Sequence, residues 1–149
     1  MRTYTDTIGE KLNDLLEKTY DAEKGYKKAL DNTENPYLKS FFVKKSTERN
    51  TFGSALKSEI TNLGQKWEED GSVTAALHRT WMDVKALFSA DDDEAMLEEA
   101  IRGEKASVQE YREVLSETDL PPSTATLLTQ QMNQIQADLN QVKRLEDLS

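Results

Sequence analysis

Charged residues interrupt the apolar faces of several predicted helices, where they could bind metal ions, exchange protons or pair with one another. Glu23 and Glu104 lie inside the apolar arcs of their helices when residues are placed at about 3.6 per turn. Glu48 borders the arc of another helix, which also carries Lys45 and Arg49 within its arc. All five residues lie near the midpoints of their helices, so we expect them at a similar depth in the core.

One chemistry open to these glutamates is a di-metal centre. Di-iron and di-manganese bundles take one Glu from each of two helices and Glu-x-x-His from each of the other two, because residues three apart share a helix face. Glu23 and Glu104 match the single glutamates. Glu48, however, is followed three residues later by Thr51, and the single histidine, His78, lies in another segment. An oxidase or metal-storage protein built on this chain would therefore use the atypical ligands Glu23, Glu48 and Glu104 for iron or manganese.

The two basic residues favour a different interpretation. Lys45 and Arg49 would project toward the same space, and two cations beside a pair of metal ions are costly in a low-dielectric core. The same cations would neutralise the three glutamates. We therefore predict a buried polar network of Glu23, Lys45, Glu48, Arg49 and Glu104, with no metal and no cofactor. A third interpretation, in which the long side chains extend outward between helices to reach water, stays open.

The elements that must position these residues are helices. The chain has 149 residues, of which 36% are hydrophobic and 32% charged, with only 6 Gly and 3 Pro, and this composition favours long helices in one domain, residues 1–149. Asn35 before Pro36 is typical of a helix start, Asp92 or Asp93 is a candidate N-cap, and Gly64 is typical of a helix end. The predicted helices cover about residues 5–32, 36–63, 73–88, 92–115 and 123–145.

The connections between these helices predict the topology. The first two helices, and the last two, are joined by tight turns and should be antiparallel. Segment 64–92 contains a helix of about 16 residues, which spans about 24 Å and can return the chain along the bundle. We therefore predict an all-α, ferritin-like four-helix bundle with a short extra helix in the crossover between the second and third long helices. A five-helix arrangement is the alternative. Gln131 and Asp138 border the apolar face of the last helix.

Several stretches are similar to those of a known family. "ALHRTWMDVKALF" (76–88) and "LEEAIRGEKASVQEYREVL" (97–115) resemble an uncharacterised bacterial ferritin-like family of small four-helix-bundle proteins, defined by a domain of unknown function. "LNDLLEKTYDAEKGYKKAL" (12–30) is similar to its first helix and "LPPSTATLLTQQ" (120–131) to its last loop. The resemblance implies the fold and no particular reaction.

The chain departs from that family at positions that bear on metal binding. The family commonly reads Glu-Arg-Gly-Glu-Asp where this chain has Ile101-Arg102-Gly103-Glu104-Lys105. Leu139 stands where members often carry a His. Fewer ligands are therefore available for a metal ion.

The predicted crossover helix carries a cluster of its own. We expect His78, Arg79, Trp81 and Asp83 to dock this helix onto the bundle. A role for His78 as a metal ligand or pH-sensitive switch is the alternative.

The overall charge restricts the partners. A net charge of −9 repels phosphate backbones and anionic lipid surfaces, so we expect neither nucleic acid nor membrane as a partner. The absence of cysteine excludes thiol chemistry, and the sequence shows neither the apolar run of a signal peptide nor a membrane span. We expect a cytoplasmic, non-catalytic binding or stress-related protein rather than an enzyme. Its partner would be an unidentified protein, a second copy of the chain in a homodimer, or a small apolar ligand.

Overall fold

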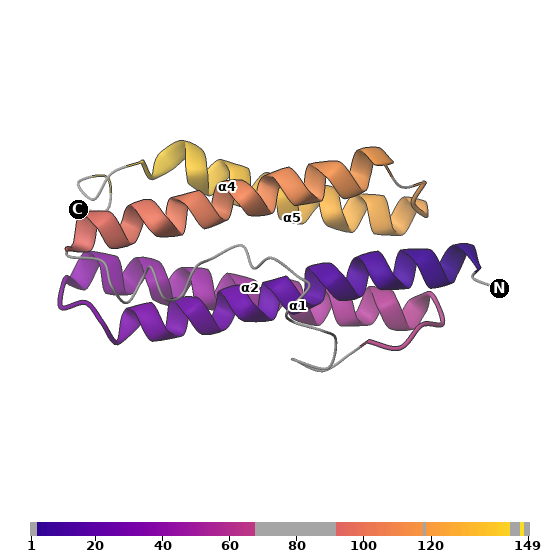
Figure 1. The fold of residues 1–149 in the computed structure, drawn as a ribbon, viewed down its shortest axis with the longest axis horizontal. Helices are drawn as coiled ribbons and strands as arrows, with labels where there is room; N and C mark the ends of the chain where they lie inside the picture. The colour runs from indigo at the N-terminus through magenta and orange to yellow at the C-terminus, as the bar shows by residue number, and fades with distance from the viewer. Residues whose placement is uncertain (1–2, 68–91, 118, 144–146, 148–149) are drawn as a thin grey trace.

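The computed structural model of the chain is all-α over the residues that it describes (Figure 1). These residues are 3–67, 92–117, 119–143 and 147. They form four helices and no strands, namely α1 (Tyr4–Leu30), α2 (Pro36–Asn62), α4 (Asp93–Glu117) and α5 (Pro122–Gln141). The all-α prediction is confirmed for this part of the chain. The expected crossover helix at 73–88, with His78, Arg79, Trp81 and Asp83, lies outside the described residues.

Local capping signals account for several of the helix ends. Asn35 Oδ1 accepts hydrogen bonds from the backbone N–H groups of Tyr37 (2.9 Å) and Leu38 (3.1 Å), and Pro36 opens α2 as predicted. Gly64 follows the end of α2 with a φ of 75°, in the left-handed region that glycine adopts without strain. Of the two candidate caps of α4, it is Asp92 that accepts a hydrogen bond from the backbone of Ala95.

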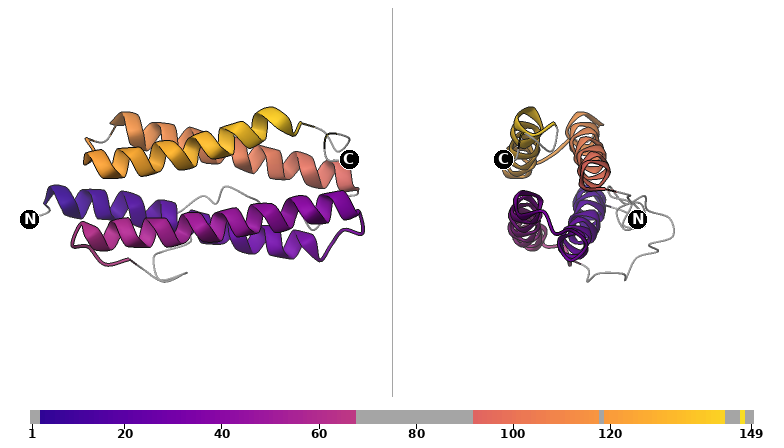
Figure 2. Two further views of the ribbon diagram at one scale, coloured as in Figure 1. Left: turned by 180° about the vertical axis from the view of Figure 1, so that it is seen from behind. Right: turned by 90° about the vertical axis from the view of Figure 1, so that its left-hand side faces the viewer.

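The four helices form two antiparallel pairs, α1 with α2 and α4 with α5, and the two pairs pack against each other. The end-on view in Figure 2 places α1 beside α4 and α2 beside α5, so that α2 and α4 lie on a diagonal of the bundle. Side-chain contacts give the directions of the helices. Lys45 contacts Glu104, and Arg49, one turn further along α2, contacts Ser107, further along α4. The diagonal helices α2 and α4 therefore run parallel, as the predicted long crossover requires.

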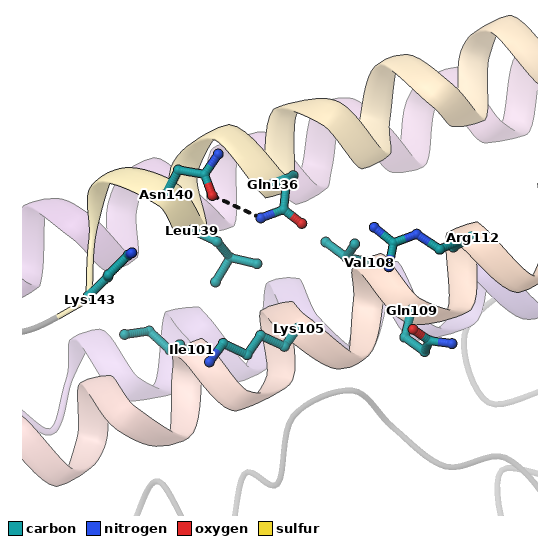
Figure 3. Close-up of a pocket in the computed structure, with 9 residues that line it drawn as sticks. All are labelled: Ile101, Lys105, Val108, Gln109, Arg112, Gln136, Leu139, Asn140 and Lys143. Atoms are coloured by element: carbon teal, nitrogen blue, oxygen red, sulfur yellow. Dashed lines mark hydrogen bonds between the residues drawn. The ribbon is translucent and has the colours of Figure 1, made fainter.

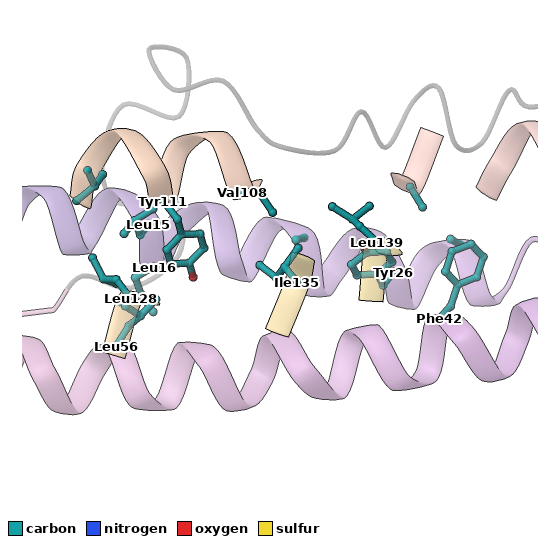
Figure 4. Packing of buried hydrophobic residues seen from close by; sticks show 14 of the residues in the cluster. Leu15, Leu16, Tyr26, Phe42, Leu56, Val108, Tyr111, Leu128, Ile135 and Leu139 are labelled. Carbon is teal, nitrogen blue, oxygen red and sulfur yellow. The ribbon is translucent and has the colours of Figure 1, made fainter. Parts of the chain in front are cut away.

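An apolar core runs the length of the bundle (Figure 4). Leu16, Leu56 and Leu128 pack toward one end of the bundle, and Tyr26 and Phe42 toward the other. The centroids of the Tyr26 and Phe42 rings lie 6.0 Å apart. Burial of these side chains is the main favourable term in folding and fixes the helix faces that meet at the centre.

A buried carboxylate holds the start of α5 against α2. Glu59 Oε2 accepts hydrogen bonds from Ser123 Oγ (2.9 Å) and Thr124 Oγ1 (2.5 Å), in the first turn of α5, where a negative charge also interacts favourably with the helix dipole.

We expect Glu59→Ala to lower the free energy of unfolding by about 1–3 kcal/mol, because two hydroxyl groups lose their acceptor in a buried place. Urea denaturation measures the change. The exposed Glu98 provides the control, and Glu98→Ala should stay within about 0.5 kcal/mol of the parent. Equal effects of the two substitutions would show that the contact does not stabilise the fold.

Candidate functional site

Two basic side chains of α2 reach the centre of the bundle. Lys45 and Arg49 are one helical turn apart, and each side chain is only 1% exposed. Buried cations are destabilising unless they are paired and hydrogen-bonded. The surrounding residues must therefore supply negative charge.

Carboxylates from three helices supply it. The Nζ atom of Lys45 lies 2.9 Å from Glu48 Oε1, 2.8 Å from Asp138 Oδ2 and 2.6 Å from Glu104 Oε1. The first two contacts are hydrogen bonds, and the third is an ion pair. Arg49 Nη1 donates to Glu48 Oε1 at 2.8 Å, and Arg49 Nη2 donates to Glu104 Oε2. These five residues, Lys45, Glu48, Arg49, Glu104 and Asp138, are called the central ion network below.

The central ion network contains one more carboxyl group than it has basic groups. Burial raises the pKa of Glu48. The charge of Lys45 lowers that pKa, and the hydrogen bond between Glu48 and Asp138 offsets part of this lowering. Burial also opposes ionisation of Asp138, but the hydrogen bonds from Lys45 and Glu48 hold the pKa of Asp138 below its usual value. Burial opposes the charge on Lys45 as well, yet the nearby Glu104 keeps the pKa of the ammonium above its usual value. With three carboxyl groups and two basic groups, one proton shared by Glu48 and Asp138 would balance the charges, in line with the opposite pKa shifts of the two groups.

The raised pKa of Glu48 gives a pH-dependent prediction. A carboxyl group whose pKa is higher in the folded state contributes stability at low pH and loses it as pH rises through the folded-state pKa. Asp138 acts in the opposite direction, but only near and below its ordinary pKa of 3.8. Above about pH 5, we therefore expect the stability of Glu48→Gln, relative to the parent, to increase with pH.

Chemical denaturation at a series of pH values tests this expectation, because Gln resembles the protonated form of Glu48 and does not titrate. The exposed Glu98→Gln is the control and should follow the parent at every pH. A Glu48→Gln variant whose relative stability falls with rising pH would contradict the shared proton.

A second polar layer lies beside the central ion network. The Tyr111 hydroxyl donates to Gln131 Oε1 at 2.6 Å, and Gln131 Nε2 donates to the carbonyl oxygen of Phe52 at 3.3 Å. Tyr111 and Tyr26 are fully buried, and burial raises the pKa of both hydroxyl groups. Both tyrosines therefore stay neutral and can donate hydrogen bonds across the physiological range.

The structure brings together four of the five residues predicted for the polar network, and it adds Asp138 from the border of the α5 face. The contacts of Glu23 are with other residues. Its Oε2 atom lies 2.9 Å from Lys27 Nζ, one turn along the same helix, and accepts a hydrogen bond from Asn50 Nδ2 at 3.2 Å.

Two small polar contacts escaped the sequence analysis. Arg49 Nη2 also donates to Ser107 Oγ at 3.5 Å, and Ser107 Oγ donates to the carbonyl oxygen of Gly103 at 3.1 Å. The position of Ser107, three residues after Glu104 on the same helix face, was the signal that could have revealed this contact.

The Lys45 ammonium lies among carboxylates from three helices. One nitrogen atom contacts carboxylates of α2, α4 and α5 within 2.9 Å. Among the described residues, no group of three or more His, Asp or Glu side chains is arranged to hold a metal ion. The arrangement neutralises charge and can hold or release a proton.

Within the described residues, the fold and the site define an all-α protein of four helices with a charged network in its core. The chain belongs to the family described as "Domain of unknown function (DUF2383)", which matches residues 7–117. The match therefore includes most of α1 and all of α2 and α4, which carry four of the five residues of the central ion network, and it ends before α5 and Asp138. A comparison with curated proteins finds no match. Separately, none of the helices within the described residues combines the length and apolar character needed to cross a membrane.

Proposed function

We propose that this protein is a ferritin-like bundle in which ion pairs stand in place of the metal centre, and that it acts by binding rather than by catalysis. The proposal of a ferritin-like topology is supported by the parallel course of α2 and α4, since two antiparallel pairs joined by a long crossover are characteristic of that fold. Its setting would be the cytoplasm, in a role that includes stress responses.

The single observation that carries the proposal is the position of Lys45. Its ammonium contacts Glu48, Glu104 and Asp138, and Arg49 binds two of these carboxylates beside it. A divalent ion at the same place would have to displace both cations, and each would then be buried without its negative partners. The carboxylates at the bundle centre are therefore already neutralised.

The burial of the central ion network supports a binding role over a catalytic one. Three members of the central ion network, Lys45, Arg49 and Glu104, are each no more than 3% exposed, so little of its charge is within reach of a substrate. The groups that meet a partner must then lie on the surface of the bundle. We expect the partner to be another protein, a second copy of the chain or a small apolar ligand.

Metal analysis of the full-length protein tests the proposal. Protein purified from cells grown with added iron or manganese should contain far less than one equivalent of either metal per chain, as measured by plasma mass spectrometry. About two equivalents, lost in Glu104→Gln but retained in the exposed control Glu98→Gln, would overturn it and favour a di-metal carboxylate protein that uses Glu23, Glu48 and Glu104.

A further inference from the structure

A groove of about 520 Å³ lies between α4 and the end of α5, and no residue of the central ion network lines it (Figure 3). It extends along α4 from Ile101 to Arg112, a length of about 16 Å. Val108 and Leu139 are buried side chains that form its floor together with Ile101. The groove is therefore long enough for an extended hydrocarbon chain of medium length.

The charge of the groove is opposite to that of the whole chain. Its lining includes Lys105, Arg112 and Lys143 and no acidic residue, although the chain carries a net charge of −9. All three basic residues are exposed. The carboxylate of Asp147 accepts a hydrogen bond from the backbone N–H of Lys143 at 2.8 Å and is not part of the lining.

The positions of the two lysines suggest where an anion would bind. Figure 3 shows the Lys105 side chain of α4 reaching toward Ile101, with Lys143, beyond α5, on the opposite wall near the same end of the groove. Arg112 lies toward the other end, where its aliphatic stem lengthens the apolar floor. The amide side chains of Gln136 and Asn140 are hydrogen-bonded to each other at 3.0 Å on the α5 wall.

We propose that this groove binds an amphiphilic carboxylate, of the medium-chain fatty acid class. The carboxylate would lie between Lys105 and Lys143, and the hydrocarbon chain would cover Leu139 and Val108. Charge complementarity selects an anion, and the apolar floor selects a ligand with a tail. This inference rests on the proposed function, because it names a ligand class for a bundle that acts by binding.

Titration of decanoate, below its micellar concentration, into the full-length chain tests the inference. In methyl and amide NMR spectra, the signals of Ile101, Val108 and Leu139 should shift saturably. The double variant Lys105→Gln with Lys143→Gln should weaken binding about tenfold, because two exposed charge contacts are lost. The matched control, Lys11→Gln with Lys39→Gln, removes two exposed positive charges on α1 and α2 and should bind like the parent.

Two further probes separate the contributions of head and tail. Acetate should not shift the three signals saturably, and decyltrimethylammonium should bind much more weakly than decanoate. The inference is overturned if decanoate causes no saturable shift, if the Lys105 and Lys143 variant binds as well as the control variant, or if the cationic probe binds equally well. Metal analysis of the same samples keeps this result separate from the proposed function, since an empty groove in a metal-free protein leaves that proposal in place.

Discussion

Replacement of Arg49 by Met should lower the free energy of unfolding by about 3–5 kcal/mol, because it removes one of the two buried cations that neutralise Glu48 and Glu104. Arg49 is 1% exposed, donates to Glu48 and Glu104, and extends across the diagonal of the bundle. Methionine retains much of the apolar contact of the arginine stem, so loss of packing contributes little to the change. Urea denaturation, followed by circular dichroism, measures the loss.

A double-mutant cycle shows whether the loss comes from the pair. Arg49→Met combined with Glu104→Leu should be much more stable than the sum of the single losses predicts, since neither charge is then left alone. Arg102 provides the control, because its side chain is 56% exposed and pairs with Glu99 on the surface. Arg102→Met should cost less than about 1 kcal/mol. Additive losses for Arg49 and Glu104 would show that the two side chains do not stabilise each other.

Lys45→Met should have an effect of similar size, about 3–5 kcal/mol near neutral pH, for a related reason. The substitution removes the one ammonium that contacts carboxylates on three helices. Its chain neighbour Lys44 is the matched control, since that side chain is 65% exposed and lies 3.9 Å from Asp138. We expect Lys44→Met to change the stability by less than about 1 kcal/mol.

Acidification should partly restore the Lys45→Met variant. Without the ammonium, the pKa of Asp138 is no longer held low, and burial raises the pKa of Glu48 further. Groups with a raised folded-state pKa stabilise the fold at low pH, so the deficit relative to the parent should shrink from about pH 7 to about pH 5. Chemical denaturation of the variant and the parent at both pH values measures this deficit. A deficit that is the same at both values would show that these carboxylates do not respond to Lys45.

Much of the fold could be predicted because its signals are local. Asn35, Pro36 and Gly64 mark helix ends through capping and backbone geometry alone, and the periodicity of apolar residues identifies the helices. The end of α5 was harder to predict. The apolar pattern continues to Val142 and Leu145, but Val142 already has an extended backbone, with φ −118° and ψ 105°. Periodicity shows which residues are apolar and does not show where the hydrogen-bonded helix stops.

The candidate site illustrates the same limit. A helical wheel places Glu23 on the apolar side of α1, but it cannot show which neighbouring helix that residue meets. Glu23 contacts Asn50 and Lys27, whereas Lys45 and Arg49 extend toward α4 and α5. Asp138 joins the central ion network because α2 and α5 pack as neighbours, and this arrangement depends on the tertiary fold.

The most direct test of the account is an anomalous-scattering experiment on a crystal of the full-length protein soaked in manganous salt. We predict continuous electron density from the Arg49 guanidinium to the Glu104 carboxylate, the Lys45 ammonium between its three carboxylates, and no anomalous peak at the bundle centre. Two anomalous peaks bridged by Glu104, with Lys45 and Arg49 turned away, would contradict the account.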